Sequence, residues 1–434
     1  MKFDNQLRYA STIIASYEGE IPLHVWLKNF FREHKQMGSK DRRLFSNMAY
    51  GFYRLGHAIK DIPSEERILT GLFLCNESPQ EILQYFRPEW NGNITRPLEE
   101  KIVLCRQSGI PFVPADIFPW KDELSEGIDH GAFCLSFLRQ PDLFLRIRPG
   151  QEKEVLRRLE QPREGMGQPI MQKPGQHQDR QTTSPVYEFI PPFTLRLPNG
   201  FNVEEWFTPD KEVVIQDYSS QRLASFLQLP PGPSIPAPSE TPGLSAPESM
   251  KSGGQTPRPY SFWDACAASG GKSILAFDLN PHLDITVSDI RESILHNLHQ
   301  RFRQAGIKNY HSFVANLATS RTSTVSRSGY DLILADVPCS GSGTWSRTPE
   351  ELYFFHPKKI LQYSEQQKKI VANILPDMKK GARFVYSTCS VFKKENEEIV
   401  AFIRNSSDWQ PDRMESIKGY DQKADSMFAA GFVV

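Results

Sequence analysis

The first 135 positions alternate apolar and polar residues at the spacing of amphipathic helices. Leu44, Met48 and Phe52 recur every four residues behind Gly38-Ser39-Lys40-Asp41, a run that can start a helix. Residues spaced in this way lie on one face of a helix, where they can be buried together. We therefore expect residues 1–135 to form an all-helical domain.

A different pattern begins near residue 136. The run from Leu143 to Arg148 predicts a strand, and residues 151–160 predict the helix that follows it. Residues 162–185 are polar and rich in Gln, Pro and Gly, which indicates a surface insertion. Residues 136–210 are therefore expected to form a small α+β subdomain that carries this insertion. Its further strands are expected at 186–189 and 193–197.

From residue 211 strands and helices alternate around a loop at 230–259 that is dominated by Pro, Ser and Gly. Such a loop cannot bury enough apolar surface to offset its ordering entropy. Alternation of this kind predicts a doubly wound, Rossmann-like α/β domain over 211–434, with ligands at the carboxyl ends of its strands. Strands are expected at 261–265, 284–289, 330–336 and 382–386. One helix is expected to start at residue 274, a second to follow the strand at 284–289 and end near residue 303, and a third to span 364–378.

Composition and charge exclude several classes of protein. The 434 residues include 51 Lys and Arg and 51 Asp and Glu, so the net charge gives no argument for a nucleic-acid partner. Basic clusters such as Arg146 to Arg158 are expected on solvated faces. The six cysteines form no CxxC pair, which disfavours a disulfide framework and a zinc site, and no metal is expected. The chain has neither a signal-like N-terminus nor an apolar run of about 18 residues. We therefore expect a cytoplasmic protein without membrane contact, and nothing requires more than a monomer.

A glycine-rich loop joins the first predicted strand of the α/β domain to its first helix. Its sequence is Asp264-Ala265-Cys266-Ala267-Ala268-Ser269-Gly270-Gly271-Lys272-Ser273. Two glycines let the backbone approach a ligand, and a helix N-terminus offers free N–H groups to a carboxylate. A P-loop needs glycine where Cys266 stands, and no G-x-G-x-x-G pattern is present here. A methyltransferase loop remains, because a strand ends in Asp289 at the distance of a ribose-binding acid, although an ordinary glycine turn stays open.

Two further predicted strands end close to a cysteine. Asp336-Val337-Pro338-Cys339-Ser340-Gly341 follows one strand, and Thr388-Cys389-Ser390 follows the other. Carbon 5 of cytosine is too poor a nucleophile to take a methyl group directly, but a thiolate that adds to carbon 6 makes it reactive. An acid near ring nitrogen 3 assists that addition, and a base then removes the proton from carbon 5. This chemistry calls for a reactive cysteine, a carboxyl group and a sulfonium cofactor in one cleft.

These motifs resemble the RsmB/Sun family of RNA cytosine-5 methyltransferases over residues 186–434. The resemblance implies that Cys389 is the nucleophile, that Cys339 assists product release and that Asp336 belongs to the catalytic group. It also implies S-adenosylmethionine as the cofactor, RNA as the partner and 16S ribosomal RNA as the substrate. The implied cofactor contacts are Cys266, Ala267, Ala268, Ser269, Gly270, Gly271, Lys272, Asp289, Asn316 and Asp336.

The resemblance extends to other parts of the chain. Residues 41–54 resemble the NusB-like, RNA-binding helical domain of the bacterial ribosomal RNA members, and residues 141–160 resemble the start of the family's small RNA-binding subdomain. Three positions depart from the family's pattern, because Ser269 replaces a proline, Asn316 an acid and Arg148 an asparagine. We expect Asn316 to alter the affinity for the cofactor while function is retained.

Three alternatives to ribosomal RNA methylation stay open. A tRNA cytosine-5 methyltransferase would use the same catalytic domain. A DNA enzyme would use Cys339, from its Pro-Cys motif, in place of Cys389, and the complete Thr-Cys-Ser motif disfavours it. A non-catalytic ribosome-assembly protein with this fold would have no chemical need for both thiols.

Aromatic residues behind the Cys339 segment offer a further expectation. A target cytosine must leave its stack to reach a thiol at the edge of a sheet, and RNA-binding sites often stack such bases on aromatic rings. Trp345 and Tyr353 are candidates for this contact, whereas Phe354 and Phe355 are expected in the core.

Overall fold

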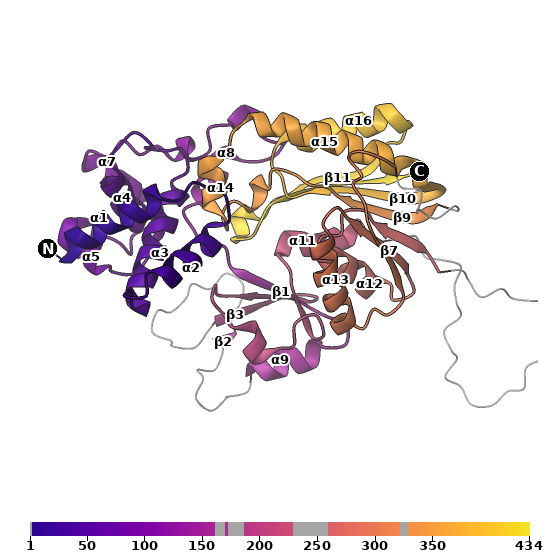
Figure 1. Cartoon of the computed structure of the whole chain (residues 1–434), viewed down its shortest axis with the longest axis horizontal. Helices are drawn as coiled ribbons and strands as arrows, with labels where there is room; N and C mark the ends of the chain where they lie inside the picture. Colours follow the sequence, from indigo (N-terminus) through magenta and orange to yellow (C-terminus); the bar gives the residue numbers. More distant parts are fainter. Residues whose placement is uncertain (1, 161–169, 172–185, 229–258, 322–328) are drawn as a thin grey trace, which may run out of the picture.

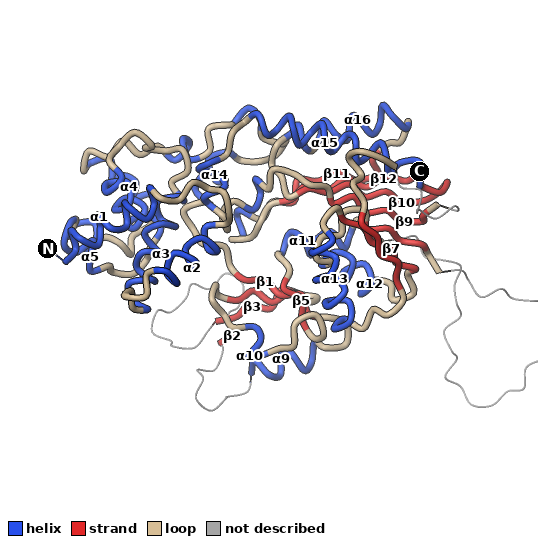
Figure 2. The backbone as a smooth tube through the Cα atoms, viewed as in Figure 1, coloured by secondary structure: helices blue, strands red, loops and turns tan. Residues whose placement is uncertain are grey.

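The computed structural model describes residues 2–160, 170–171, 186–228, 259–321 and 329–434. A helical region forms one end of the molecule, and a small β-sheet and a seven-stranded β-sheet form the rest (Figure 1, Figure 2). The polar insertion predicted at 162–185 lies outside the described residues except for Ile170–Met171. The loop predicted at 230–259 lies outside them except for residue 259.

The N-terminal region is all-helical, as its apolar spacing predicts. The helix expected behind Gly38 is α3, which begins at Ser39. The helices are α1 (Lys2–Ala15), α2 (Leu23–Glu33), α3 (Ser39–Arg54), α4 (Ser64–Cys75), α5 (Glu81–Phe86), α6 (Pro88–Gly92), α7 (Leu98–Gln107) and α8 (His130–Ser136), with the 3-10 turns η1 (Pro114–Ile117) and η2 (Lys121–Glu123) between the last two.

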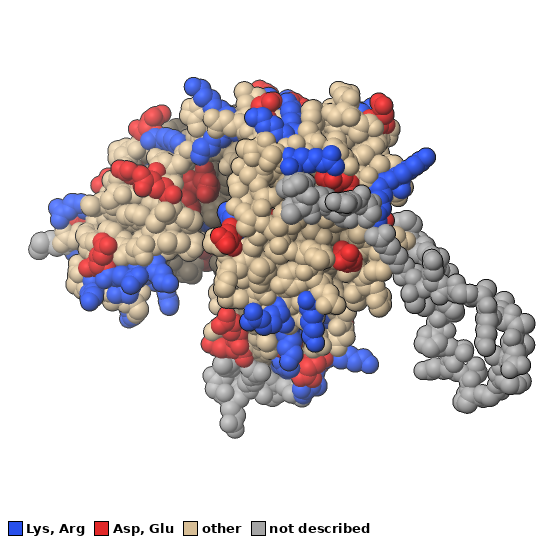
Figure 3. Space-filling model, turned by 45° about the vertical axis from the view of Figure 1, so that its right-hand side comes forward, with Lys and Arg blue, Asp and Glu red and all other residues tan. Residues whose placement is uncertain are grey.

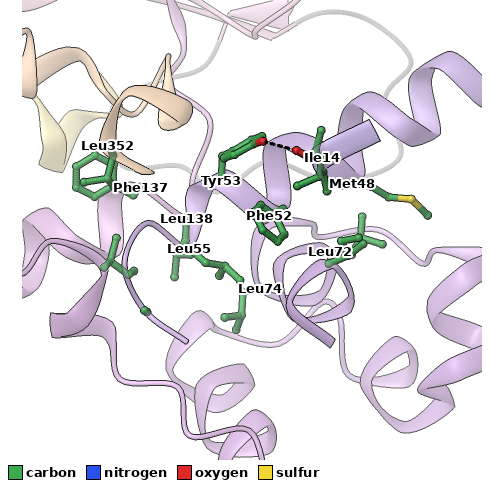
Figure 4. Packing of buried hydrophobic residues seen from close by; sticks show 14 of the residues in the cluster. Ile14, Met48, Phe52, Tyr53, Leu55, Leu72, Leu74, Phe137, Leu138 and Leu352 are labelled. Atoms are coloured by element: carbon green, nitrogen blue, oxygen red, sulfur yellow. Dashed lines mark hydrogen bonds between the residues drawn. The ribbon is translucent and has the colours of Figure 1, made fainter. Parts of the chain in front are cut away.

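The hydrophobic core of the helical region extends into the C-terminal half of the chain. Helices α3 and α4 approach closely where Gly51 faces Gly71, and a Cβ atom at Gly71 would lie 2.3 Å from the carbonyl oxygen of Gly51. Leu352 of α14 (Pro349–Phe354) belongs to the same buried cluster and lies near Phe137 (Figure 4). The helical region and the α/β domain therefore share one core, so the two fold against each other.

Arg54, at the end of α3, adds polar bonds to this shared core. Its Nη1 donates to the carbonyl oxygens of Phe137 at 2.8 Å and Ser346 at 2.9 Å, and its Nη2 donates to the side chain of Gln140. Ser346 lies in the segment that follows Cys339. The buried Arg54 guanidinium therefore connects the helical region to the segment that carries this candidate site residue.

Arg54→Ala is expected to lower the free energy of unfolding by about 3 kcal/mol, because buried carbonyl groups would lose their donor. Arg43→Ala, at an exposed position on the same helix, is the matched control and should have little effect. Urea unfolding of both variants measures the difference. Equal stability of the two variants would show that Arg54 does not join the two regions.

The small sheet has the strand order β2-β3-β4-β1-β5. Val155 and Leu159 of α9 (Glu152–Glu160) and Trp206 of α10 (Val203–Trp206) pack in its core. The sheet extends past residue 210, where we placed the end of the small subdomain. Its strands are β1 (Leu143–Ile147), β2 (Ile170–Met171), β3 (Val186–Ile190), β4 (Thr194–Leu197) and β5 (Val213–Ile215).

Arg146 and Arg148 are buried, so the expectation that they lie on a solvated face is wrong. Both guanidinium groups pair with Asp278, and the distance from Arg148 Nη2 to Asp278 Oδ1 is 2.6 Å. Arg148 also donates to the carbonyl oxygen of Ala305 at 2.7 Å. These contacts satisfy the buried charges, and they hold the small sheet against α12 (Gly271–Leu279) and α13 (Glu292–Ala305).

The large sheet has the order β11-β12-β10-β9-β6-β7-β8, in which β12 is antiparallel to both of its neighbours and the other pairs are parallel. This is the predicted Rossmann-like sheet, and the strand order reverses between β6 and β9. Ligands of such sheets bind beyond the carboxyl ends of the strands at this point. The strands are β6 (Ser261–Asp264), β7 (Asp284–Asp289), β8 (Tyr310–Val314), β9 (Tyr330–Asp336), β10 (Met378–Thr388), β11 (Pro411–Ile417) and β12 (Met427–Val433).

Helices cover both faces of the large sheet. On one face α12 and α13 pack against side chains such as Leu332 and Val385. On the other face α15 (Lys358–Ile374) and α16 (Glu397–Ser407) pack against the alternate residues, such as Ile333 and Phe384. Successive strand residues point to opposite faces, so the continuous apolar runs of β9 and β10 are explained by burial on both sides.

Several elements differ from their predicted bounds. Helix α12 begins at Gly271 and not at residue 274, because the helix starts directly from the glycine turn. Helix α15 spans Lys358–Ile374 instead of 364–378, because Pro376 lies in a 3-10 turn and β10 begins at Met378. Elements absent from the sequence expectation are β8, β11, β12, α14, α16, α10 and α11 (Tyr218–Arg222).

On the face drawn in Figure 3 acidic and basic side chains are interspersed, which agrees with the balanced charge. Among the helices in the described ranges, none combines the length and apolar character that a membrane span requires.

Candidate active site

Three neighbouring strands end in an aspartate at the same edge of the large sheet. Asp264 is the last residue of β6, Asp289 of β7 and Asp336 of β9. These strands are parallel and adjacent, so the three carboxyl groups converge beside the point where the strand order reverses. The sequence identified Asp289 and Asp336 for the site but did not assign a role to Asp264.

The loop between β6 and α12 is held in a tight turn against Asp289. The N–H of Ala268 donates to Asp289 Oδ2 at 3.0 Å, and the N–H of Ala267 donates to the carbonyl oxygen of Ser288 at 2.8 Å. Gly270 has a φ of +82°, and a Cβ atom there would lie 2.8 Å from Phe302. Only glycine meets both the backbone and the packing demands at this position.

Asp264 is buried beneath this loop. Its Oδ2 accepts a hydrogen bond from Ser273 Oγ at 2.6 Å, whereas Oδ1 has no partner among the described residues. Burial raises the pKa of Asp264 to about 7. A buried acceptor without a donor indicates a place where a ligand with N–H or O–H groups can bind.

Cys266 lies between the three carboxyl groups. Burial, with added repulsion from Asp264, Asp336 and Asp289, raises its pKa well above the usual value for a thiol. A thiolate is therefore strongly disfavoured there, so Cys266 lines the loop and is no candidate nucleophile. The concentration of negative charge around it favours a ligand that carries positive groups.

Arg301 of α13 supports the glycine-rich loop at residues 265–272, called the cofactor loop below, through hydrogen bonds to Ser269. Its Nη1 donates to the carbonyl oxygen of Ser269 at 3.1 Å and to Ser269 Oγ at 3.0 Å. The guanidinium is held in turn by Asp210, with 2.7 Å between Nη2 and Oδ1. Ser269, which departs from the family's proline, therefore gains a side-chain bond that proline cannot make.

The two predicted thiols meet at the carboxyl edge of β9 and β10. Cys389 directly follows β10, and its Sγ lies 3.2 Å from Sγ of Cys339. The hydrogen bond with Cys389, followed by burial, raises the pKa of Cys339 well above its usual value. Cys339 therefore favours its protonated form, in which it can donate a hydrogen bond to the Cys389 sulfur.

Lys272 and Asp336 form an ion pair beside the thiols. The distance from Lys272 Nζ to Asp336 Oδ2 is 2.7 Å, and Ser387 Oγ donates to Asp336 Oδ1 at 2.7 Å. Burial disfavours the ammonium, but attraction to Asp336 and, more weakly, to Cys389 raises the pKa of Lys272 overall. Lys272 therefore keeps a positive charge beside the two thiols.

Asn316 lies two residues after β8 and is exposed. Its Oδ1 accepts the N–H of Ala318 at 3.1 Å, and the N–H of the preceding Ala315 donates to the carbonyl oxygen of Asp289 at 3.0 Å. Asn316 therefore caps a turn at the rim of the site, while the other predicted residues line its floor.

Trp345 is buried at 1% exposure, so the expectation that it stacks on an RNA base is wrong. It packs among aromatic rings that include Trp120 and Phe355, in the shared core. Phe355 is in that core as predicted. Phe354 is partly exposed at 38% and contacts Tyr17, and Tyr353 packs on Tyr53.

Glu395 was not identified from the sequence, although it lies at the centre of the thiol segments. It is fully buried, and its carboxylate accepts hydrogen bonds from the residues that follow both cysteines. Most of its neighbours in the run Lys393-Lys394-Glu395-Asn396-Glu397-Glu398 are charged, which is typical of a solvated surface. No local signal distinguishes Glu395 from its exposed neighbours.

Comparison with known proteins shows what these segments are similar to. Residues 256–429 match the family model described as 16S rRNA methyltransferase RsmB/F. A Bacillus subtilis protein named probable ribosomal RNA small subunit methyltransferase B is 34% identical over 151 residues, which cover 34% of this chain and 34% of that protein. The Proteus mirabilis ribosomal RNA small subunit methyltransferase B is 27% identical over 240 residues, 55% of this chain and 48% of that protein. The chain thus spans from about a third to about a half of these relatives.

A solved structure matches nearly the whole chain in fold. The crystal structure of a protein named PH0851 covers 94% of this chain and 93% of its own, with a TM-score of 0.58 and 16% sequence identity. At this identity the match supports the arrangement of the elements and carries no information on the reaction.

Proposed function

We propose that this chain is an S-adenosylmethionine-dependent RNA methyltransferase that methylates carbon 5 of cytosine in 16S ribosomal RNA. The match of residues 256–429 to the model of the 16S rRNA methyltransferases RsmB/F supports this proposal. The observation that carries the proposal is the contact between Cys339 and Cys389, whose sulfurs are 3.2 Å apart beside the Lys272–Asp336 ion pair. The two thiols, the Asp336 carboxyl group and the Lys272 ammonium group therefore lie together at the same edge of the sheet.

The residues around the cofactor loop fit S-adenosylmethionine chemically. The N-terminus of α12 offers N–H groups to its carboxylate, and Asp289, at the end of β7, suits the ribose hydroxyls. Asp264 Oδ1 is a buried acceptor without a protein donor, and three carboxyl groups face a cofactor that carries ammonium and sulfonium charges. When bound, the cofactor supplies an electrophilic methyl group on its sulfonium.

Cys389 acts as the nucleophile in the proposed reaction. Its thiolate forms a bond from Sγ to carbon 6 of cytosine, and the electron pair of the ring double bond becomes available at carbon 5. As the thiolate adds, ring nitrogen 3 takes up a proton from water, and the Asp336 carboxylate stabilises that protonated nitrogen. Lys272 keeps Asp336 in place through the ion pair between them.

Cys339 serves the release step. Removal of the proton from carbon 5 lets the bond between Sγ and carbon 6 break, which returns Cys389 as a thiolate and restores the aromatic ring. The hydrogen bond with Cys389 is the largest cause of the raised pKa of Cys339, and it is lost once the Cys389 sulfur is bonded to carbon 6. Cys339 then lies where it can accept or relay that proton.

The other regions supply RNA contacts in this proposal. We assign residues 1–135 to a NusB-like RNA-binding domain, residues 136–210 to a small RNA-binding subdomain and residues 211–434 to the catalytic domain. The shared core and the Arg148–Asp278 pair keep these parts in fixed positions around the thiols. A rigid frame of this kind can select one cytosine in a folded RNA.

Transfer of labelled methyl to unmodified 16S ribosomal RNA, measured beside a tRNA pool, tests the substrate. Label in ribosomal cytosine alone supports the proposal. Label in tRNA alone keeps the cytosine chemistry and overturns the substrate. No label in either, even with assembled small subunits, favours the non-catalytic assembly protein.

Arg301→Ala is expected to weaken S-adenosylmethionine binding about tenfold. The variant removes the group that donates to the carbonyl oxygen and to Oγ of Ser269, so the loop is held less firmly. Arg303→Ala, at an exposed position of the same helix, is the matched control. Calorimetric titration of each variant measures the dissociation constant. An unchanged constant in Arg301→Ala would mean that the loop keeps its shape without this support.

A further inference from the structure

A buried carboxylate joins the two cysteine-bearing segments from behind. Glu395, in the 3-10 turn η6 (Lys393–Glu395), has no exposed surface. Its Oε2 accepts the N–H of Ser340 at 2.8 Å, and its Oε1 accepts Ser390 Oγ at 3.0 Å. Ser340 directly follows Cys339 and Ser390 directly follows Cys389, so one side chain contacts the neighbours of both thiols.

Further bonds fix this carboxylate in place. Gln367 of α15 donates through Nε2 to Glu395 Oε2 at 3.1 Å and to the carbonyl oxygen of Pro338 at 2.9 Å. Tyr386 Oη donates to the backbone carbonyl of Glu395 at 2.6 Å. The carboxylate is therefore held from α15, and the backbone of Glu395 is held from β10.

Hydroxyl groups complete the connection. The Oγ atoms of Ser340, Ser342 and Ser390 lie 3.1 to 3.2 Å from one another. Ser342 and Ser390 also accept the N–H groups of Val391 and Phe392. Breaking the carboxylate's bonds would therefore release a network and not a single contact.

We propose that Glu395 is a positioning residue that clamps the segments after β9 and β10 together and so sets the distance between Cys339 and Cys389. The catalytic relevance of that distance rests on the proposed function. The clamp itself concerns only this chain's own geometry, and it is measurable without RNA or cofactor.

The chemical nature of the clamp predicts which substitutions preserve it. Glutamine has the same shape, and its carbonyl oxygen can accept from Ser340 and Gln367 while its amide donates to Ser390 Oγ, a hydroxyl that can also accept. Aspartate keeps the charge but is one methylene shorter, so it cannot reach both segments. Glu395→Gln should thus preserve the thiol geometry, whereas Glu395→Asp and Glu395→Ala should lose it.

Disulfide formation measures this geometry directly. Diamide takes two electrons and two protons from a pair of thiols, which become a disulfide while diamide becomes a hydrazine. In the wild type and in Glu395→Gln, Cys339 and Cys389 should oxidise at similar rates, as followed by mass spectrometry of the folded protein. The rate should fall at least about tenfold in Glu395→Asp and Glu395→Ala, because the sulfurs no longer meet. Glu398→Ala, at an exposed position of the adjoining helix, is the matched control.

Methyl transfer by the same variants gives the second readout. The turnover number should fall about 100-fold in Glu395→Asp while the dissociation constant of S-adenosylmethionine stays unchanged, and Glu395→Gln should restore turnover. Wild-type oxidation and turnover in Glu395→Asp would overturn the clamp. If the wild type methylates no RNA but the oxidation rates follow the predicted order, the clamp stands and the proposed function fails. If methylation is present and all variants oxidise alike, the clamp fails alone.

Discussion

Cys389→Ala lowers the rate of methyl transfer to RNA by roughly 10⁴-fold or more if Cys389 forms the covalent bond to cytosine, because removal of a nucleophile leaves only binding and orientation. Carbon 5 does not become reactive without addition at carbon 6, so no neighbouring group can replace the thiolate. Transfer of labelled methyl under single-turnover conditions measures the loss, and circular dichroism checks that the variant is folded.

Two controls sharpen this result. Cys75→Ala removes a thiol from the helical region and should retain wild-type turnover. The dissociation constant of S-adenosylmethionine should be the same in Cys389→Ala as in the wild type, because the loop at 265–272 is intact. Turnover near the wild-type rate in Cys389→Ala would exclude Cys389 as the nucleophile and direct attention to Cys339.

Cys339→Ala should convert the enzyme into a trap for its RNA. Addition and methyl transfer require Cys389, which is intact, whereas release requires the proton at carbon 5 to be removed. We therefore expect a covalent complex of protein and RNA that approaches one RNA per protein and survives denaturing electrophoresis. Turnover should be lost in parallel.

The double variant Cys339→Ala, Cys389→Ala is the control for the trap. It should form no covalent complex, because the sulfur that binds carbon 6 is absent. Free turnover by Cys339→Ala without accumulation of the complex would show that another base serves the release step. A complex in the double variant would place the covalent bond on a different residue.

Strong local signals explain why much of the fold could be predicted from the sequence. The strands β7 and β9 have the predicted bounds, because β9 contains an apolar run and β7 alternates Ile and Val with Thr and Ser, and each ends in an aspartate. By contrast β8 (Tyr310–Val314) lies at the edge of the sheet and mixes His and Ser with apolar residues, so it lacks a strand pattern. Its pairing with β7 comes from tertiary structure alone.

The site shows the same division between local and distant effects. The cofactor loop, Asp289, Asp336 and both thiols follow strand ends, and the topology of parallel strands brings such residues together. Glu395 contacts Ser340 across 55 residues of sequence and Arg301 contacts Ser269 across 32, and neither has a motif. Buried charges of this kind are paired by the fold, and the sequence does not reveal their partners.

The most direct test of the central claim uses RNA that carries tritium on carbon 5 of cytosine. Methylation at this carbon expels its hydrogen, so the protein should release one tritium into water for each methyl group transferred, and only when S-adenosylmethionine is present. Methyl transfer without release of tritium would place the methyl group on another atom and contradict the proposed reaction.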